Sequence, residues 1–200
     1  MKGFLKIIGA VAVINILARL VGFAREQFIG IQYGTTVYSD SIINAYTIPN
    51  FLYLVIGGAF TTAFISIYHK TGSSITEYIR RTFTTIVVTI TLVVLLFMAL
   101  ADPILMQFFH VKDPEEYEML RTLYYWMMPS TIMLVLSTWM SGILNVQGRY
   151  NLSAFSVLIY NATFLLISVV LSFVMGPIGM GVGALVGAIF MFLFLVYGVR

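Results

Sequence analysis

Residues 17–40 read LARLVGFAREQFIGIQYGTTVYSD and place four charged side chains, Arg19, Arg25, Glu26 and Asp40, where two hydrophobic stretches meet. The apolar core of a bilayer is about 30 Å thick, so a helix needs roughly 20 apolar residues to cross it, and both stretches are long enough. A charged side chain within such a span is costly and usually faces a bundle interior or a water-filled cavity. This segment therefore predicts a polytopic helical membrane protein with a polar interior.

The composition of the chain supports the same fold class. Of its 200 residues, 60% are hydrophobic and only 10% are charged, which is unlike a soluble globular domain. The net charge of +3 does not indicate nucleic-acid binding, because the basic residues are scattered among the hydrophobic stretches and form no patch. The absence of cysteine excludes disulfides and thiolate chemistry in this chain.

Six stretches are predicted to span the membrane as one all-α domain. They cover about residues 4–24, 38–67, 82–101, 121–146, 152–175 and 177–199. The first begins like a signal peptide but has no small-residue cleavage site before Arg19, so we expect an uncleaved span. The second is too long for one straight helix, and Pro49 with Gly57 and Gly58 is expected to kink it.

The positive-inside rule predicts the orientation of these spans. With the N-terminus in the cytoplasm, seven Lys and Arg residues fall inside and two, Lys112 and Arg121, fall outside. The outer segment 102–121 collects five acidic residues and is predicted to be a solvated loop. The inner segment 68–81 is predicted to form a short amphipathic surface helix capped by Ser73 or Ser74. Both termini are therefore expected in the cytoplasm.

Arg19 and Arg25 are the principal candidate site residues. On an ideal helix they lie about 120° apart, so they share a face only if the helix bends at Gly22. Asp40 begins the next span at about the depth of Arg25. If one of the two arginines pairs with Asp40, the other stays free, and its charge would make a cavity selective for anions. The alternative is structural: Arg25 and Glu26 snorkel to the interface, and Arg19 pairs with Asp40.

The second span contains further polar residues. Its segment NAYTIPNFLYLVIGGAFTTAF, residues 44–64, places Asn50 and Tyr53 close to Pro49. Proline frees a backbone carbonyl for a polar neighbour or a ligand, which is typical of a helix that lines a cavity. Polar contacts between helices explain the pattern equally well.

Three other patterns predict packing rather than binding. Gly179, Gly183 and Gly187 recur every four residues and predict a close approach of another helix. The same spacing of serine and asparagine in the fourth span predicts hydrogen bonds between helices, with cavity lining as the alternative. These polar residues are Ser137, Ser141 and Asn145. The aromatic run 124–126 is expected at a membrane interface.

No catalytic or metal site is indicated by the sequence. His69 and His110 fall on opposite membrane faces in this topology, and no nucleophile, zinc or nucleotide motif occurs. The chain is therefore predicted not to be an enzyme, and no cofactor is expected.

Two segments carry a family resemblance. Residues 18–64, ARLVGFAREQFIGIQYGTTVYSDSIINAYTIPNFLYLVIGGAFTTAF, resemble the N-terminal signature of MurJ (MviN) type lipid II flippases, in the polysaccharide-exporter branch of the superfamily that includes MATE transporters. Residues 141–161, SGILNVQGRYNLSAFSVLIYN, are similar to the family's fourth helix and the turn into the fifth. The resemblance implies about fourteen helices in two lobes around a cavity that opens alternately to each side. This chain corresponds to the N-terminal lobe, and we expect a fragment of a longer chain rather than one of two assembled copies.

The resemblance also implies a function in peptidoglycan synthesis at the bacterial cytoplasmic membrane. Arginines of the family's first two helices are thought to hold the pyrophosphate of an undecaprenyl-linked saccharide, and guanidinium binds phosphate oxygens bidentately. Arg19 and Arg25 match the first-helix pair, Asp40 matches an acid that pairs with them, and Asn50 and Tyr53 complete the predicted site. The implied partners are the lipid-linked oligosaccharide, membrane lipids, a coupling ion that the sequence does not name, and a C-terminal lobe or second copy.

The second helix departs from the family pattern. Tyr53 and Leu54 stand where the family commonly carries arginine, and Gly57 replaces an acid. Because one arm of the phosphate clamp is missing, another lipid-linked oligosaccharide, such as a capsule or teichoic acid precursor, is the first alternative to lipid II. A non-transporting scaffold of envelope assembly is the second. A MATE-like exporter of cations would need acidic residues in the cavity, and the arginines argue against it.

Overall fold

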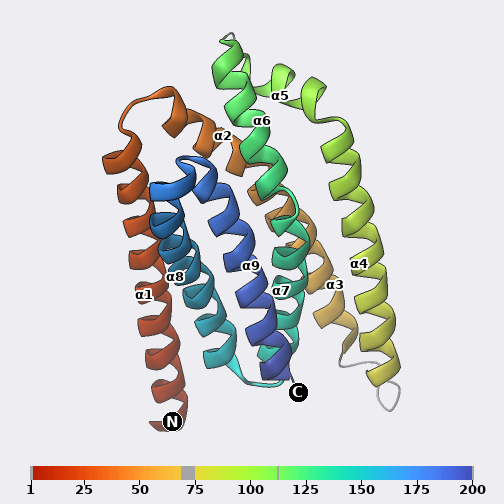
Figure 1. Ribbon diagram of the computed structural model, residues 1–200. Helices are drawn as coiled ribbons and strands as arrows, with labels where there is room; N and C mark the ends of the chain where they lie inside the picture. Colours follow the sequence, from red (N-terminus) through yellow and green to blue (C-terminus); the bar gives the residue numbers. More distant parts are fainter. Residues whose placement is uncertain (1, 69–74, 112, 200) are drawn as a thin grey trace.

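The computed structural model describes residues 2–68, 75–111 and 113–199, and these ranges form a bundle of helices (Figure 1). The second span consists of three consecutive pieces, α2 (Val37–Leu52), the π-helix η1 (Tyr53–Gly57) and α3 (Gly58–Tyr68). The other helices are α1 (Lys2–Tyr33), α4 (Ile75–Ala99), α5 (Ala101–Phe109), α6 (Pro114–Met127), α7 (Ser130–Val146), α8 (Tyr150–Met175) and α9 (Ile178–Val199). Both termini lie at the same end of the bundle.

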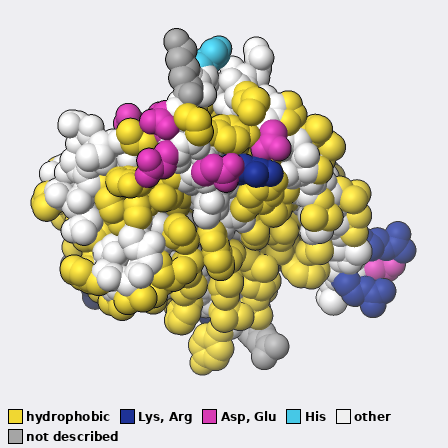
Figure 2. Space-filling view, turned by 45° about the horizontal axis from the view of Figure 1, so that its top comes forward, with side chains coloured by type: hydrophobic (Ala, Val, Ile, Leu, Met, Phe, Trp, Pro, Cys, Tyr) yellow, Lys and Arg dark blue, Asp and Glu magenta, His cyan; other side chains and the backbone are white. Residues whose placement is uncertain are grey.

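Six helical segments of the described chain are long and apolar enough to cross a membrane. They are Leu5–Tyr33, Val37–Tyr68, Ile75–Ala99, Pro114–Val146, Tyr150–Met175 and Ile178–Val199. Figure 2 shows the flank of the molecule covered by hydrophobic side chains, as a lipid-facing surface requires. The predicted all-α bundle of six membrane helices is confirmed.

Several predicted boundaries are wrong because charged residues do not end these helices. α1 continues past residue 24 to Tyr33 and ends at Gly34, whose φ of 59° lies in the left-handed region. α4 begins at Ile75, so residues 75–81 are its first turns and not a separate surface helix. The predicted caps Ser73 and Ser74 lie outside the described residues, as do His69 and Lys112.

The second span is disturbed where the sequence predicts it, but by a π-helical turn. Pro49 lies inside α2, and the wider turns of η1 follow directly after that helix. Gly57 of η1 packs against α7, where an added Cβ would lie 3.3 Å from the Cβ of Thr138. π-helical turns of this kind are frequent at functional sites.

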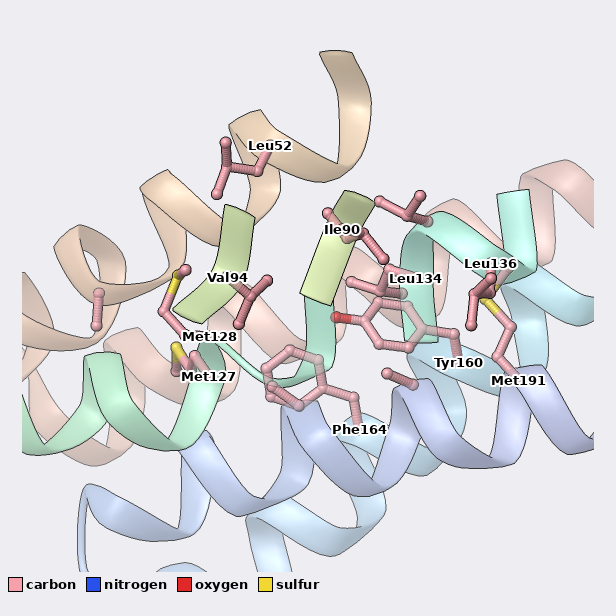
Figure 3. Close-up of a cluster of buried hydrophobic side chains, with 14 of the residues drawn as sticks. Leu52, Ile90, Val94, Met127, Met128, Leu134, Leu136, Tyr160, Phe164 and Met191 are labelled. Atoms are coloured by element: carbon pink, nitrogen blue, oxygen red, sulfur yellow. The ribbon is translucent and has the colours of Figure 1, made fainter. Parts of the chain in front are cut away.

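α7 is the central helix of the bundle. In the most apolar part of the fourth span, 72% of the residues are buried inside the structure, against 6% in the first span. Figure 3 shows part of this interior, in which Leu134 and Leu136 lie among side chains of neighbouring helices. α1 therefore lies at the edge of the bundle and presents most of its surface outward.

The glycine stripe of α9 packs closely against α8. A Cβ added to Gly183 would lie 3.0 Å from the carbonyl oxygen of Phe164 and closer still to the hydroxyl of Ser168. A Cβ on Gly187 would lie 3.1 Å from the carbonyl oxygen of Tyr160. The predicted close approach of helices is confirmed, and it fixes the position of α8.

The end of the bundle opposite the termini carries acidic side chains, which Figure 2 shows gathered on the surface. In place of the predicted loop, α5 and α6 form there, and Asp113 caps α6 by accepting the backbone N–H of Glu115 at 2.9 Å. Asp102 joins the two helices, because its Oδ1 accepts from Tyr117 at 2.7 Å and lies 3.0 Å from Nε of Arg121.

Tyr124 is buried in the bundle rather than placed at the interface. Its hydroxyl donates to the carbonyl of Phe97 at 3.0 Å, whereas the exposed Tyr125 donates to the carbonyl of Met98 at 3.2 Å. Both carbonyls belong to the last turn of α4, where backbone acceptors lack helical partners. The two tyrosines therefore fasten α4 to α6.

Replacing Tyr124 by phenylalanine is expected to destabilise the fold by about 1 kcal/mol, because it removes a hydrogen bond from a buried helix end. The matched control is Tyr125→Phe, whose hydroxyl is at the surface and can be replaced by water. Thermal unfolding of the purified protein in one detergent measures both variants. Equal changes in Tm for the two variants would contradict the prediction.

Candidate functional site

A groove of about 400 Å³ lies between α1, α2, η1, α6 and α8, and one of the predicted site arginines lines it. Its charged side chains are those of Arg25 and Glu26, both from α1. The remaining lining residues are Ile29, Ile42, Ile43, Tyr46, Thr47, Asn50, Phe51, Leu54, Met127 and Phe164. We call this site the arginine groove. It is mostly apolar with a few convergent polar groups, as ligand sites usually are.

The guanidinium of Arg25 is largely enclosed by neighbouring side chains. Its side chain is 12% exposed, and its carbon atom Cζ lies 4.6 Å from the ring centre of Phe164 and 5.3 Å from that of Tyr46. Both distances are within the range of cation–π attraction. Phe164 comes from α8 and Tyr46 from α2, so two helices besides its own fix the position of Arg25.

Glu26 is the acidic partner of Arg25. Nη2 of Arg25 donates to Oε1 of Glu26 at 2.6 Å, and Nε donates to the same oxygen at 3.2 Å. Glu26 is 51% exposed, so the pair lies at the rim of the groove. These bonds leave the Nη1 donors of Arg25 without an acceptor among the described residues, and a guanidinium has five N–H groups to offer. Arg25 can therefore bind an anion without first losing Glu26.

The predicted pairing of an arginine with Asp40 is not formed in this structure. Within the described ranges no ion pair joins Asp40 to Arg19 or Arg25, and both Arg19 and Asp40 are exposed and lie outside the groove. Asp40 is in the first turn of α2, whereas Arg25 lies about 12 Å along α1 from the end at Tyr33, so their depths differ. α1 is also uninterrupted at Gly22, so Arg19 and Arg25 face different sides.

The other two predicted site residues line different sites. Asn50 lines the arginine groove together with Arg25. Tyr53 lines a neighbouring pocket of about 470 Å³. The structure therefore brings Arg25 and Asn50 together and places Tyr53 in a second site.

Among the residues that the structure describes, no hydrogen bond joins Ser137, Ser141 or Asn145 to another helix, contrary to the prediction from the sequence. Ser141 and Asn145 line the same pocket as Tyr53, which is the alternative that the sequence left open. Ser137 is fully buried, and its hydroxyl has no hydrogen-bond partner among the described residues.

The sequence does not predict that α8 contributes Phe164 to the arginine groove. Phe164 is distant from Arg25 in the chain, and a phenylalanine in a hydrophobic helix gives no local signal of its role. Asn161 brings the two helices together, because its side-chain nitrogen donates to the carbonyl of Ala18 at 3.1 Å. Its amide also lies against Gly22, where an added Cβ would be 3.7 Å away.

Comparison with known proteins shows the family. The family model described as lipid II flippase MurJ matches residues 31–200. The probable lipid II flippase MurJ of Rickettsia prowazekii (strain Madrid E) is 24% identical over 193 residues, which cover 92% of this chain and 38% of that protein. The probable lipid II flippase MurJ of Rhizobium meliloti (strain 1021) is 30% identical over 161 residues, covering 76% of this chain and 30% of that protein. The chain thus spans less than half the length of these relatives.

Solved structures share the fold. A structure titled lipid II flippase MurJ, inward closed conformation, matches 94% of this chain and 41% of its own chain, with a TM-score of 0.81 and 23% identity. An outward-facing MATE family multidrug transporter of the MOP superfamily matches 94% of this chain and 44% of its own, with a TM-score of 0.76 and 13% identity. Since the family model covers most of its residues, this chain is a multi-pass protein of the bacterial inner membrane that belongs to the MurJ family.

Proposed function

We propose that this chain forms one lobe of a transporter that moves an undecaprenyl-pyrophosphate-linked saccharide, with lipid II as the first choice, across the bacterial inner membrane. The family is one of transporters and not of enzymes. The matched relatives are named lipid II flippases, and this chain covers 38% of one and 30% of another. The proposal therefore includes a second lobe, either a C-terminal one or another copy of this chain.

The observation that carries the proposal is the environment of Arg25. A permanently charged side chain, 12% exposed, lies within a membrane span beside a groove and keeps donors free. Its only acidic partner among the described residues is Glu26, which is half-exposed at the rim of the groove. A pyrophosphate offers several charged oxygens to such a guanidinium, and the apolar walls strengthen their attraction.

Alternating access requires that the substrate bind the inward-open and outward-open states differently. We propose that Glu26 holds Arg25 when the groove is empty and that phosphate oxygens take the free donors when the substrate enters. We further propose that Arg19 and Asp40, which are exposed on this lobe, contribute to the site only in the complete transporter. The membrane potential can supply about 2.3 kcal/mol per charge per 100 mV to this cycle, and a coupling ion can add to it.

One observation favours a different saccharide as the second candidate. Tyr53 supplies a hydroxyl where the family commonly carries an arginine, and it faces a pocket without charged residues. A lipid-linked precursor whose saccharide makes more neutral hydrogen bonds than that of lipid II, such as a capsule precursor or a teichoic acid precursor, is therefore the second candidate.

Transport by the complete protein in liposomes tests the proposed function. One preparation of liposomes contains fluorescent lipid II, and another contains a labelled undecaprenyl-linked capsule or teichoic acid precursor. A quencher that cannot cross the membrane reports the fraction of each lipid that has moved to the other leaflet. We expect faster crossing of lipid II than in protein-free liposomes. Crossing of the other precursor alone would replace the substrate but keep the mechanism. Crossing of neither would contradict the proposed function.

A further inference from the structure

The pocket of about 470 Å³ that Tyr53 lines differs in chemistry from the arginine groove. It is formed by α1, η1, α7, α8 and α9, and none of its lining residues is charged. It nevertheless gathers amides and hydroxyls from four of these elements. They include Asn15, Tyr53, Ser141, Asn145, Tyr150 and Ser153. We call this site the neutral pocket.

The neutral pocket and the arginine groove follow one another along the same side of the bundle. Asn50 lines the groove and Tyr53, one turn further along the second span, lines the pocket. On α1, Asn15 lies ten residues before Arg25, which is about 15 Å along the helix axis. The pocket is therefore on the side of the groove toward the termini, where α7 ends and α8 begins (Figure 1).

Tyr160 of α8 stands between the two sites. It is 7% exposed, and its hydroxyl interacts electrostatically with Tyr46 of the groove and Tyr53 of the pocket. The Tyr46 hydroxyl is also close enough to pair with it through a side-chain hydrogen bond. Figure 3 shows Tyr160 beside Phe164, the residue that contacts Arg25. Tyr160 therefore connects the polar groups of the arginine groove with those of the neutral pocket.

The chemistry of the neutral pocket selects the class of ligand. A charged group would lose its hydration there without an opposite charge, and a lipid tail would leave the amides unpaired. A saccharide both donates and accepts hydrogen bonds, as amides and hydroxyls do, and its apolar ring face can lie on tyrosine rings. We infer that the neutral pocket binds the saccharide of the lipid-linked substrate while Arg25 binds the pyrophosphate. This inference rests on the proposed function.

Binding of two lipids to the full chain in nanodiscs tests the inference. The probes are undecaprenyl pyrophosphate and the same lipid carrying a disaccharide. Wild type is expected to bind the glycosylated lipid more tightly. Asn145→Leu, which keeps the size of the side chain and removes its amide, is expected to weaken binding of the glycosylated lipid by about tenfold and to leave the bare lipid unchanged. Ser141→Ala serves as a second variant if Asn145→Leu does not fold.

Two further variants complete the design. Asn151→Leu is the matched control, because Asn151 is exposed near the start of α8 and lines neither site, so it is expected to bind both lipids like wild type. Arg25→Gln is expected to weaken the binding of both lipids by the same factor. Equal weakening of both lipids by Asn145→Leu, no change in either, or equal binding of both lipids by wild type would overturn the inference. Wild type that binds neither lipid would instead contradict the proposed function.

Discussion

Replacing Arg25 with glutamine is expected to reduce transport of lipid II by about a hundredfold or more, because removal of one partner from an enclosed charge contact costs several kcal/mol. Glutamine keeps two N–H donors but carries no charge and has no Cζ, so the attraction to the ring of Phe164 is lost together with the anion contact. Flipping by the complete protein in liposomes measures the effect. Arg80→Gln is the matched control, since Arg80 is exposed near the start of α4 and lies outside the groove.

A double variant separates binding from structure at this site. If Arg25 only neutralises Glu26, then Arg25→Gln leaves an unpaired carboxylate, and adding Glu26→Gln should restore transport. If Arg25 binds the pyrophosphate, the double variant stays inactive while Glu26→Gln alone keeps transport. Full restoration in the double variant would therefore remove Arg25 from the substrate site.

The fold class can be predicted from the sequence, because membrane-spanning helices are recognisable as long stretches of apolar residues. The six spans and the close packing at Gly183 follow from patterns within single helices. The end of α1 and the start of α4 do not follow from the sequence, because charged residues lie inside these helices: Arg25 and Glu26 in α1, and Arg80 and Arg81 in α4. A helix in water or at an interface accommodates charged residues easily, so charge alone is a poor signal of where it ends.

The candidate site was predictable only in part. Arg25 stands out in the sequence because a charge in an apolar helix is costly, and Asn50 because it follows a proline. The sequence predicts that either Arg19 or Arg25 pairs with Asp40, because the two spans are joined by a short connection, whereas the structure pairs Arg25 with its neighbour Glu26. Phe164 and Tyr160 were not predictable, because their roles depend on how α8 lies against α1, which no local pattern encodes.

The glycines of α9 connect the packing of the bundle to the site. Gly183 and Gly187 allow α9 to approach the backbone of α8 at Phe164 and Tyr160. Phe164 contacts the guanidinium of Arg25, and Tyr160 stands between the groove and the neutral pocket. A shift of α8 away from α9 would therefore also change the wall of the arginine groove.

Gly183→Ala is accordingly expected to destabilise the fold by about 1–3 kcal/mol, because the new Cβ would lie 3.0 Å from the carbonyl oxygen of Phe164, which cannot rotate away. Gly30→Ala is the matched control: no atom lies within 4 Å of its added Cβ, and alanine favours helix by up to about 1 kcal/mol, so stability should be unchanged or raised.

Thermal unfolding in one detergent measures the stability of both variants, and flipping of lipid II below Tm measures the state of the arginine groove. We expect Gly183→Ala to lower both Tm and transport, since α8 must move to admit the methyl group. A lowered Tm with wild-type transport would show that the position of Phe164 does not matter for Arg25, and an unchanged Tm would show that α8 and α9 are less closely packed than the structure indicates.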